Sequence, residues 1–220
     1  MPSSKKLLKS FRGRLLKKAS LYLVLDAQVC SYARLFEIAK KAVSAGVDVI
    51  QLRDKFGSAK DILEFSIRMV RLCCGKTLYI VNDRIDLALL SGADGVHLGQ
   101  DDISCTEARE MLGRNRIIGV SCQNGKHLKA AQNDGADYIG FGSVFKTQTK
   151  PLRQPVNLKL LKEIYQQARL PVFAIGGIKL ENAEGLLKIG VNRIAVTRAL
   201  SLTSNIEKSV FHFKKIFPHV

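Results

Sequence analysis

The chain has 220 residues, of which 46% are hydrophobic, and its formal net charge is +16. This length suits a single domain and the composition supplies a buried core, but no apolar run approaches the roughly 18 to 20 residues that a membrane span needs. The five cysteines show no C-x-x-C spacing, so neither a disulfide framework nor a zinc site is predicted, and reduced thiols fit a soluble cytoplasmic protein.

Basic residues are most concentrated at the N-terminus. Residues 1–19 contain seven lysines and arginines and no acid, and leucines and Phe11 are interleaved with them as in a basic amphipathic helix. We expect a basic extension that lies outside the folded domain. A transit peptide, a membrane-surface helix and a loose solvated segment all fit this pattern.

The remaining positive charge is spread among acidic residues. Aromatic residues make up 7% of the chain and tryptophan is absent, so nothing resembles the aromatic and basic platform on which single-stranded nucleic acid stacks. A positive field also attracts an anionic small molecule. We therefore expect small-molecule substrates and no nucleic-acid partner.

One sequence pattern recurs along the chain. It consists of a glycine, a small apolar residue, Asp or Asn, and then a short apolar strand, and its four copies begin at Gly46, Gly92, Gly135 and Gly190. A glycine at this place can end a helix, because it adopts the left-handed conformation without penalty. Each interval between copies is long enough for two βα units.

Other apolar runs fall before and between these copies, at 21–25, 77–81, 116–120 and 171–175, which gives eight strands in all. Helical patterns separate the strands, at 32–45, 59–73, 84–91, 104–112, 125–134, 157–168, 180–189 and 204–215. Strict alternation predicts a parallel sheet, and at this length a (β/α)8 TIM barrel over residues 20–220. A doubly wound open sheet is the alternative; recurrence on the even strands favours the barrel.

Polar residues that follow each strand of such a barrel face its catalytic end. Gln51, Arg53 and Lys55 alternate at the end of the second strand, so they share one face and should converge inside the mouth. Asn82 and Asp83 follow the third strand.

The fourth strand is followed by a second carboxylate pair, Asp101 and Asp102. Carboxylates on neighbouring strand ends repel unless a cation joins them, and oxygen ligands with room for water and phosphate oxygens suit Mg²⁺. Alternatively, one or both of the pair cap the helix that begins near Ser104.

Ser121 ends the fifth strand without a nearby histidine, which favours hydrogen bonding over nucleophilic catalysis. A long polar loop follows the sixth strand, and its candidate site residues are Thr147, Gln148, Thr149 and Lys150. Such a loop is too long for a simple connector.

The seventh strand ends in Gly176 and Gly177, just before a helix. Paired glycines let backbone N–H groups approach an anion, and this is the common phosphate position of the barrel. Thr197 and Arg198 of the eighth strand should lie in the same corner. We therefore expect two anion sites in one mouth: a diphosphate site with basic side chains and a divalent cation, and a monophosphate site at the glycines.

Six motifs, taken together and in this order, resemble the thiamine phosphate synthase family over about residues 21–200. They are Q-L-R-D-K (51–55), N-D (82–83), G-V-H-L-G-Q-D-D (95–102), G-V-S (119–121), T-Q-T-K (147–150) and A-I-G-G-I (174–178). The resemblance implies a transferase of thiamine biosynthesis that joins a hydroxymethylpyrimidine diphosphate to a thiazole phosphate and releases diphosphate and thiamine phosphate.

The resemblance also implies residue roles. The pyrimidine diphosphate would be bound by Gln51, Arg53, Lys55, Asn82 and Lys150. Mg²⁺ would be held by Asp83 and Asp102, with Ser121 beside the departing diphosphate. The thiazole phosphate would be bound by residues 147–149, Gly176, Gly177, Thr197 and Arg198. Catalysis by charge stabilisation would then rest on Arg53, Ser121 and Lys150.

Two departures from the family pattern fall on the thiazole side. Cys122 and Gln123 stand where the family commonly has a small residue and then a histidine, and Thr197-Arg198 replaces a common Val-Ser. The alternatives are a thiazole tautomerase of the same barrel family and a non-catalytic basic barrel that binds nucleic acid through residues 1–19. The basic side chains and carboxylates of the expected diphosphate site, which we call the diphosphate clamp, favour the synthase, because a proton transfer does not need them. The sequence also allows the protein to form a homo-oligomer.

Replacement of Lys150 tests the expected clamp. Lys150→Ala should lower turnover on the order of 10² to 10³-fold, the usual effect of losing one preorganised electrostatic contact, while the circular dichroism spectrum stays unchanged. Full activity in the purified variant would remove Lys150 from the clamp.

Overall fold

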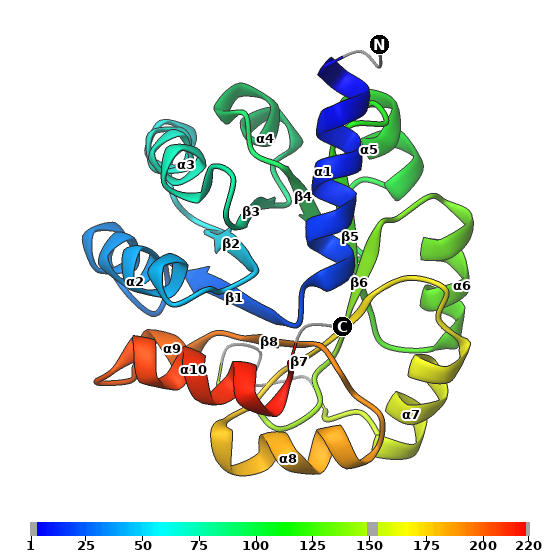
Figure 1. Cartoon of the computed structure of the whole chain (residues 1–220). Helices are drawn as coiled ribbons and strands as arrows, with labels where there is room; N and C mark the ends of the chain where they lie inside the picture. The colour runs from blue at the N-terminus through cyan, green and yellow to red at the C-terminus, as the bar shows by residue number, and fades with distance from the viewer. Residues whose placement is uncertain (1–3, 149–153, 219–220) are drawn as a thin grey trace.

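The computed structural model describes residues 4–148 and 154–218, with side chains from residue 11 onward. Eight parallel strands pair in sequence order, and β8 pairs with β1 to close a barrel (Figure 1). The strands are β1 (Leu21–Asp26), β2 (Val49–Arg53), β3 (Leu78–Asn82), β4 (Gly95–Leu98), β5 (Ile117–Cys122), β6 (Tyr138–Gly142), β7 (Val172–Ile175) and β8 (Ile194–Val196). The predicted TIM barrel is confirmed and the open sheet is wrong.

Helices surround the barrel as expected (Figure 1). They are α1 (Ser4–Lys18), α2 (Tyr32–Ser44), α3 (Ala59–Cys73), α4 (Ile85–Ser91), α5 (Cys105–Leu112), α6 (Gly125–Asn133), α7 (Leu158–Gln167), α8 (Leu180–Lys188), α9 (Arg198–Ser201) and α10 (Ile206–Ile216). The predicted helices agree in order and in approximate bounds. The short α9, directly after β8, was not predicted.

The recurrent glycine and aspartate have distinct structural tasks. All four glycines have a left-handed backbone, with φ between 80° and 93°, so each turns the chain out of its helix. Each aspartate then accepts a backbone N–H at the start of the preceding strand: Asp48 from Leu21, Asp94 from Tyr79 and Asp137 from Ile118, at 2.8 to 2.9 Å. The repeat therefore ties neighbouring strands together at the N-terminal end of the barrel.

Each of these carboxylates also binds a basic side chain from another element. Their partners are Lys214 for Asp48, Arg12 for Asp94 and Arg109 for Asp137. In the fourth copy Asn192 replaces the aspartate, and the Tyr165 hydroxyl instead joins β7 to the start of β8. It accepts the Ala174 N–H at 3.2 Å and lies 2.8 Å from the Arg193 carbonyl.

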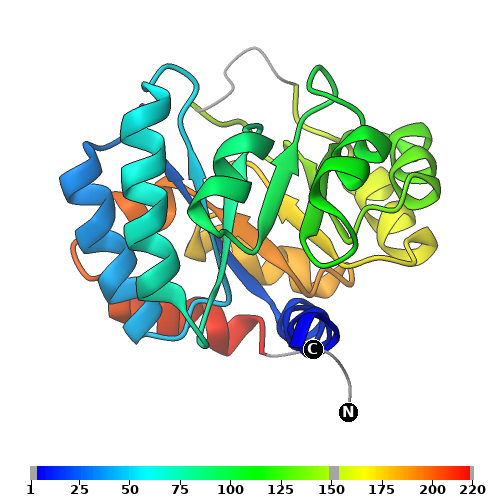
Figure 2. The same ribbon diagram turned by 90° about the horizontal axis from the view of Figure 1, so that it is seen from above.

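Helix α1 covers the N-terminal end of the barrel, on the side where both termini are marked (Figure 2). Arg12 binds Asp94 at 2.6 Å and the Asn115 carbonyl at 3.1 Å. Leu16 and Ala19 are buried and belong to the cluster that fills the barrel interior. For residues 11–18 the loose solvated alternative is therefore wrong, whereas a domain boundary at residue 19 stays a prediction.

None of the described helices is long and apolar enough to cross a membrane.

Replacement of Asp48 tests the role of the repeat. Asp48→Ala removes the carboxylate that accepts from two backbone N–H groups and from Lys214, and it should lower the free energy of unfolding by about 2 to 4 kcal/mol. Asp86→Ala is the control, because Asp86 pairs with Arg84 on the exposed surface and such pairs contribute little. Equal urea midpoints for the two variants would contradict this role.

Candidate active site

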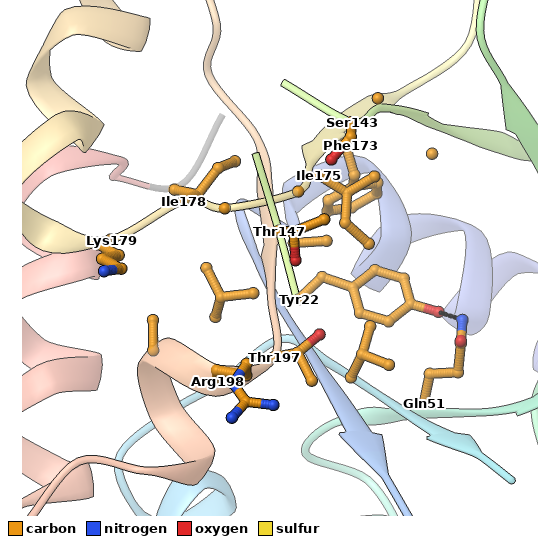
Figure 3. A pocket seen from close by; sticks show the side chains of 18 of the residues that line it. Tyr22, Gln51, Ser143, Thr147, Phe173, Ile175, Ile178, Lys179, Thr197 and Arg198 are labelled. Carbon is orange, nitrogen blue, oxygen red and sulfur yellow. Dashed lines mark hydrogen bonds between the residues drawn. The ribbon is translucent and has the colours of Figure 1, made fainter. Parts of the chain in front are cut away.

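A cavity of about 870 Å³ opens at the carboxyl ends of the strands. It extends from the buried Tyr22 and Gln51 to Thr197 and Arg198 at the end of β8, with Lys179 on its far side (Figure 3). A smaller pocket of about 110 Å³ adjoins it and shares Arg53, Asn82 and Ser121 with it. The small pocket is also lined by Lys55, Asp83, Gly99, Gln100, Asp101 and Asp102.

The two basic residues of the small pocket are held by carboxylates. Arg53 donates to the buried Asp26 at 2.8 Å and to Gln28 at 3.1 Å, so its guanidinium is oriented before any ligand binds. Lys55 donates to Asp83 across the pocket. Gln51, Arg53 and Lys55 therefore converge on the mouth as predicted, although the Gln51 amide lies deeper and binds the Tyr22 hydroxyl.

The end of β3 places two further groups for ligand binding. The buried Asn82 Nδ2 has no hydrogen-bond partner within the described part of the chain, and because Asn82 lines the small pocket this donor can serve an oxygen of a ligand. Asp83 has a left-handed backbone with φ 59°, and such strain in a residue other than glycine concentrates at functional sites.

Asp83 and Asp102 lie against each other at one side of the small pocket, close enough for each carboxyl group to shift the pKa of the other. Burial and this contact raise the pKa of Asp83, while Lys55 opposes the change. Burial of Asp102 is outweighed by its contacts with Asp83 and with the Gly99 N–H, so its pKa is lowered. Two carboxylates in contact favour either a shared proton or a cation, and they fit a divalent ion that takes its other ligands from water and phosphate. Within the described residues no group of three or more His, Cys, Asp or Glu side chains surrounds a metal position.

The alternative that Asp101 or Asp102 caps α5 is wrong. Ser104 is the N-cap, and it forms a capping box with Glu107. Asp102 instead accepts the Gly99 N–H at 2.7 Å and is free to face the pocket. Asp101 is exposed on the rim.

Ser121 does have a histidine beside it, and the expectation that none lies nearby is wrong. His97 Nε2 lies 2.9 Å from Ser121 Oγ, and His97 Nδ1 lies 3.1 Å from the Tyr138 hydroxyl. His97 pairs with Gly119 in the register of β4 and β5. Ser121 lies two residues further along β5 toward the mouth, and the His97 side chain extends far enough to reach it. No histidine is adjacent to Ser121 in the sequence, and the contact arises from the pairing of β4 with β5.

Aromatic rings form the floor of the cavity. The centroid of Phe173 lies 5.3 Å from that of Tyr22 and 5.6 Å from that of Tyr138, and both pairs are nearly perpendicular. Gly119 makes this packing possible, because a Cβ at that position would overlap the Tyr138 ring. We had not predicted these residues as part of the site. The only sequence signal was an aromatic residue at an inward position in β1, β6 and β7.

The second half of the cavity is built around the paired glycines. Gly176 and Gly177 have left-handed backbones, with φ 107° and 64°. A Cβ on Gly177 would lie 2.5 Å from the Lys146 carbonyl oxygen and 2.8 Å from Phe145 Cβ, so the β6–α7 loop packs directly on the glycine backbone. This corner, next to the start of α8, fits an anion such as phosphate.

The other predicted residues of this half also line the cavity. Thr147, Gln148, Thr197 and Arg198 face it together with Ser143 and Lys146, and several of them are visible in Figure 3. Thr149 and Lys150 lie outside the described residues, so their predicted roles stay predictions.

Of the departures from the family pattern, Cys122 keeps its thiol in the protonated form. Its side chain is buried, and burial raises the pKa of its thiol to about 12, so the thiolate is scarce at neutral pH. Gln123 is half-buried after β5. Arg198 is exposed at the mouth and is the departure that changes the charge of the cavity.

Comparisons with known proteins agree with the fold and the motifs. A family model described as thiamine monophosphate synthase matches residues 21–200. The thiamine-phosphate synthase of Methanosarcina barkeri is 35% identical over 93% of this chain and 93% of that protein. That of Ruminiclostridium cellulolyticum is 38% identical over 90% of this chain and 95% of that protein. A relative from Prochlorococcus marinus strain AS9601 is longer, and this chain spans 58% of it at 37% identity.

Among solved structures, thiamine phosphate pyrophosphorylase from Pyrococcus furiosus superposes with a TM-score of 0.82. The two chains are 34% identical, and the match covers 92% of this chain and 97% of that one.

The paired-glycine corner can be tested with inorganic phosphate. Gly177→Ala should weaken phosphate binding measured by titration calorimetry, because alanine is strained at φ 64° and displaces the Lys146 carbonyl. Gly185→Ala in α8 is the matched control: a Cβ there meets nothing within 4 Å, and alanine is the better helix former. Unchanged phosphate affinity in Gly177→Ala would remove the anion site from this corner.

Proposed function

The chain belongs to the thiamine monophosphate synthase family, and we propose that it joins a hydroxymethylpyrimidine diphosphate to a thiazole phosphate, giving thiamine phosphate and diphosphate with the help of Mg²⁺. The observation that carries the proposal is the composition of the small pocket. Arg53, Lys55, Asn82 and Ser121 line it beside the Asp83–Asp102 pair, so hydrogen-bond donors and potential metal ligands surround a single volume.

Such a pocket suits a leaving diphosphate. In a dissociative reaction the bond between the pyrimidine methylene carbon and the diphosphate oxygen breaks first, and the electron pair leaves with the diphosphate. The thiazole nitrogen then donates its lone pair to the methylene carbon and forms the new C–N bond. Arg53 and Lys55 would stabilise the negative charge that develops on the leaving oxygens, without a covalent intermediate on the enzyme.

The deep aromatic floor supports binding of the pyrimidine. Three aromatic rings form it, and the faces of such rings attract a cation. A positive pyrimidine methylene group formed above Tyr22, Tyr138 and Phe173 would therefore gain electrostatic stabilisation and protection from water. Gln51 is a polar side chain at the same level, and its amide fits the ring nitrogens and the amino group.

Asp83 and Asp102 are the proposed Mg²⁺ ligands. Their mutual contact supports this role, because ionising both carboxyl groups requires a nearby cation. When bound, Mg²⁺ supplies Lewis-acid stabilisation of the diphosphate oxygens. Lys55, which donates to Asp83, would remain close enough to bind the same diphosphate.

The thiazole phosphate would occupy the paired-glycine half of the cavity. The Gly176–Gly177 backbone offers N–H donors, and Thr147 and Thr197 offer hydroxyl groups. Arg198 adds a fixed positive charge at the rim, where it would strengthen binding of the monophosphate.

A tautomerase is disfavoured, and so is a non-catalytic barrel. The His97–Ser121 contact does provide a possible proton carrier, which removes one argument against the tautomerase. The small pocket remains the decisive feature, because a proton transfer on the thiazole needs neither Arg53 nor two adjacent carboxylates. Both alternatives leave that pocket without a function.

The proposed metal role predicts a specific pattern of loss. Asp102→Asn should lower turnover roughly 10² to 10³-fold, and added Mg²⁺ should restore part of it, because the remaining ligand still binds the ion weakly. Asp86→Asn, an exposed carboxylate paired with Arg84, is the control and should match the wild type at every Mg²⁺ concentration. Wild-type activity and Mg²⁺ dependence in Asp102→Asn would reject Asp102 as a ligand.

A further inference from the structure

We propose that an interior hydrogen-bond network, formed by Gln51, Tyr22, Tyr138, His97 and Ser121, holds His97 in the Nε2–H tautomer. In this state Ser121 accepts from His97 and directs its own proton toward the ligand. The inference deepens the proposed function, and it makes Tyr138 and His97 positioning residues that act through Ser121.

The network is continuous from the barrel interior to the mouth. Gln51 Nε2 donates to the Tyr22 hydroxyl at 2.8 Å, and the Tyr22 and Tyr138 hydroxyls lie 2.8 Å apart. The Tyr138 hydroxyl lies 3.1 Å from His97 Nδ1, and His97 Nε2 lies 2.9 Å from Ser121 Oγ. Tyr22, Tyr138 and Gln51 are buried and the other two are half-buried, so water does not interrupt the inner links.

The inner end sets the direction of donation. The Tyr22 hydroxyl accepts from Gln51, so its own proton needs an acceptor, and Tyr138 is the neighbouring oxygen. A buried hydroxyl that fails to donate loses a hydrogen bond without compensation from water. Once Tyr138 accepts from Tyr22, the Tyr138 proton is directed to His97 Nδ1. A neutral imidazole that accepts at Nδ1 carries its proton on Nε2.

The outer end requires the same direction. A diphosphate oxygen only accepts hydrogen bonds, so Ser121 can bind it only as a donor. Ser121 Oγ is then left to accept from His97, which is what the Nε2–H tautomer provides. In the opposite tautomer His97 Nε2 would accept the hydrogen bond of the Ser121 O–H and so compete with the ligand for that donor.

The barrel packing keeps the network in place. His97, Gly119 and Tyr138 lie at the same level on three successive strands. With only hydrogen at Gly119, the His97 and Tyr138 rings approach to 5.5 Å between centroids. A Cβ on Gly140 would lie 3.3 Å from His97 Cε1, so the imidazole is also confined from the β6 side.

The tautomer can be measured without any substrate. In protein labelled with ¹⁵N-histidine, long-range ¹H–¹⁵N correlation spectra at pH 8 should show His97 protonated at Nε2 and unprotonated at Nδ1, with the signal assigned by its loss in His97→Asn. Tyr138→Phe should give a mixture of the two neutral His97 tautomers, with part of the protein protonated at Nδ1. Tyr79→Phe is the matched control, because it removes a fully buried hydroxyl bonded only outside the network, to Ser66 at 2.9 Å.

A double-mutant cycle tests whether the network acts through Ser121. Tyr138→Phe should lower kcat roughly 3- to 10-fold, the effect of one neutral hydrogen bond. In a Ser121→Ala background the same replacement should change kcat less than twofold, whereas Tyr79→Phe should leave kcat unchanged in both backgrounds. The melting temperatures of Tyr138→Phe and Tyr79→Phe are compared as well. If they are similar, the lower kcat of Tyr138→Phe comes from lost positioning of Ser121 and not from a destabilised fold.

Two results would overturn the proposal. One is a wild-type His97 protonated at Nδ1, which rejects the assigned direction even if the synthase activity is confirmed. The other is an equal effect of Tyr138→Phe with and without Ser121, which rejects action through that hydroxyl. Absence of synthase activity with the predicted tautomer would instead reject the proposed function and leave the network intact.

Discussion

Closure of the parallel sheet is the constraint on which the site depends. All eight strands end on one side, so residues as distant in sequence as Arg53 and Ser121 line the same small pocket. The opposite end of the barrel supplies the stability for this arrangement. There Asp48, Asp94 and Asp137 tie the starts of neighbouring strands together, and α1 closes the interior. The N-terminal ends of the strands thus stabilise the barrel, and the carboxyl ends form the candidate active site.

Much of this arrangement could be predicted from the sequence, because it depends on periodic or local signals. The Gly-x-Asp repeat marks the helix ends and even strands, and strand order then places Gln51, Arg53, Lys55 and Asn82 at the mouth. The His97–Ser121 contact was missed because it depends on the stagger between β4 and β5. The aromatic floor was missed for a related reason: aromatic residues at inward positions of strands usually indicate core, and the meeting of the three rings depends on how β1, β6 and β7 face one another across the closed barrel. The role of Ser104 in capping α5 became clear only from its capping box.

The two halves of the mouth differ in how they would bind phosphate. The proposed diphosphate half would use side chains held in advance by carboxylates, such as Arg53 against Asp26 and Lys55 against Asp83. The proposed monophosphate half would use a backbone that only glycine can adopt without strain, with Arg198 added at the rim. Preorganised charge suits a group that gains negative charge during the reaction. Backbone N–H groups such as those of Gly176 and Gly177 suit a phosphate that is unchanged by the reaction and needs only to be bound.

The most direct test of the account is the reaction itself. The 220-residue protein, incubated with the pyrimidine diphosphate and the thiazole phosphate, should form thiamine phosphate and diphosphate in equal amounts with Mg²⁺, and the reaction should stop when EDTA is added. No thiamine phosphate in the presence of Mg²⁺ would contradict the synthase assignment. Undiminished product in EDTA would contradict the role given to Asp83 and Asp102.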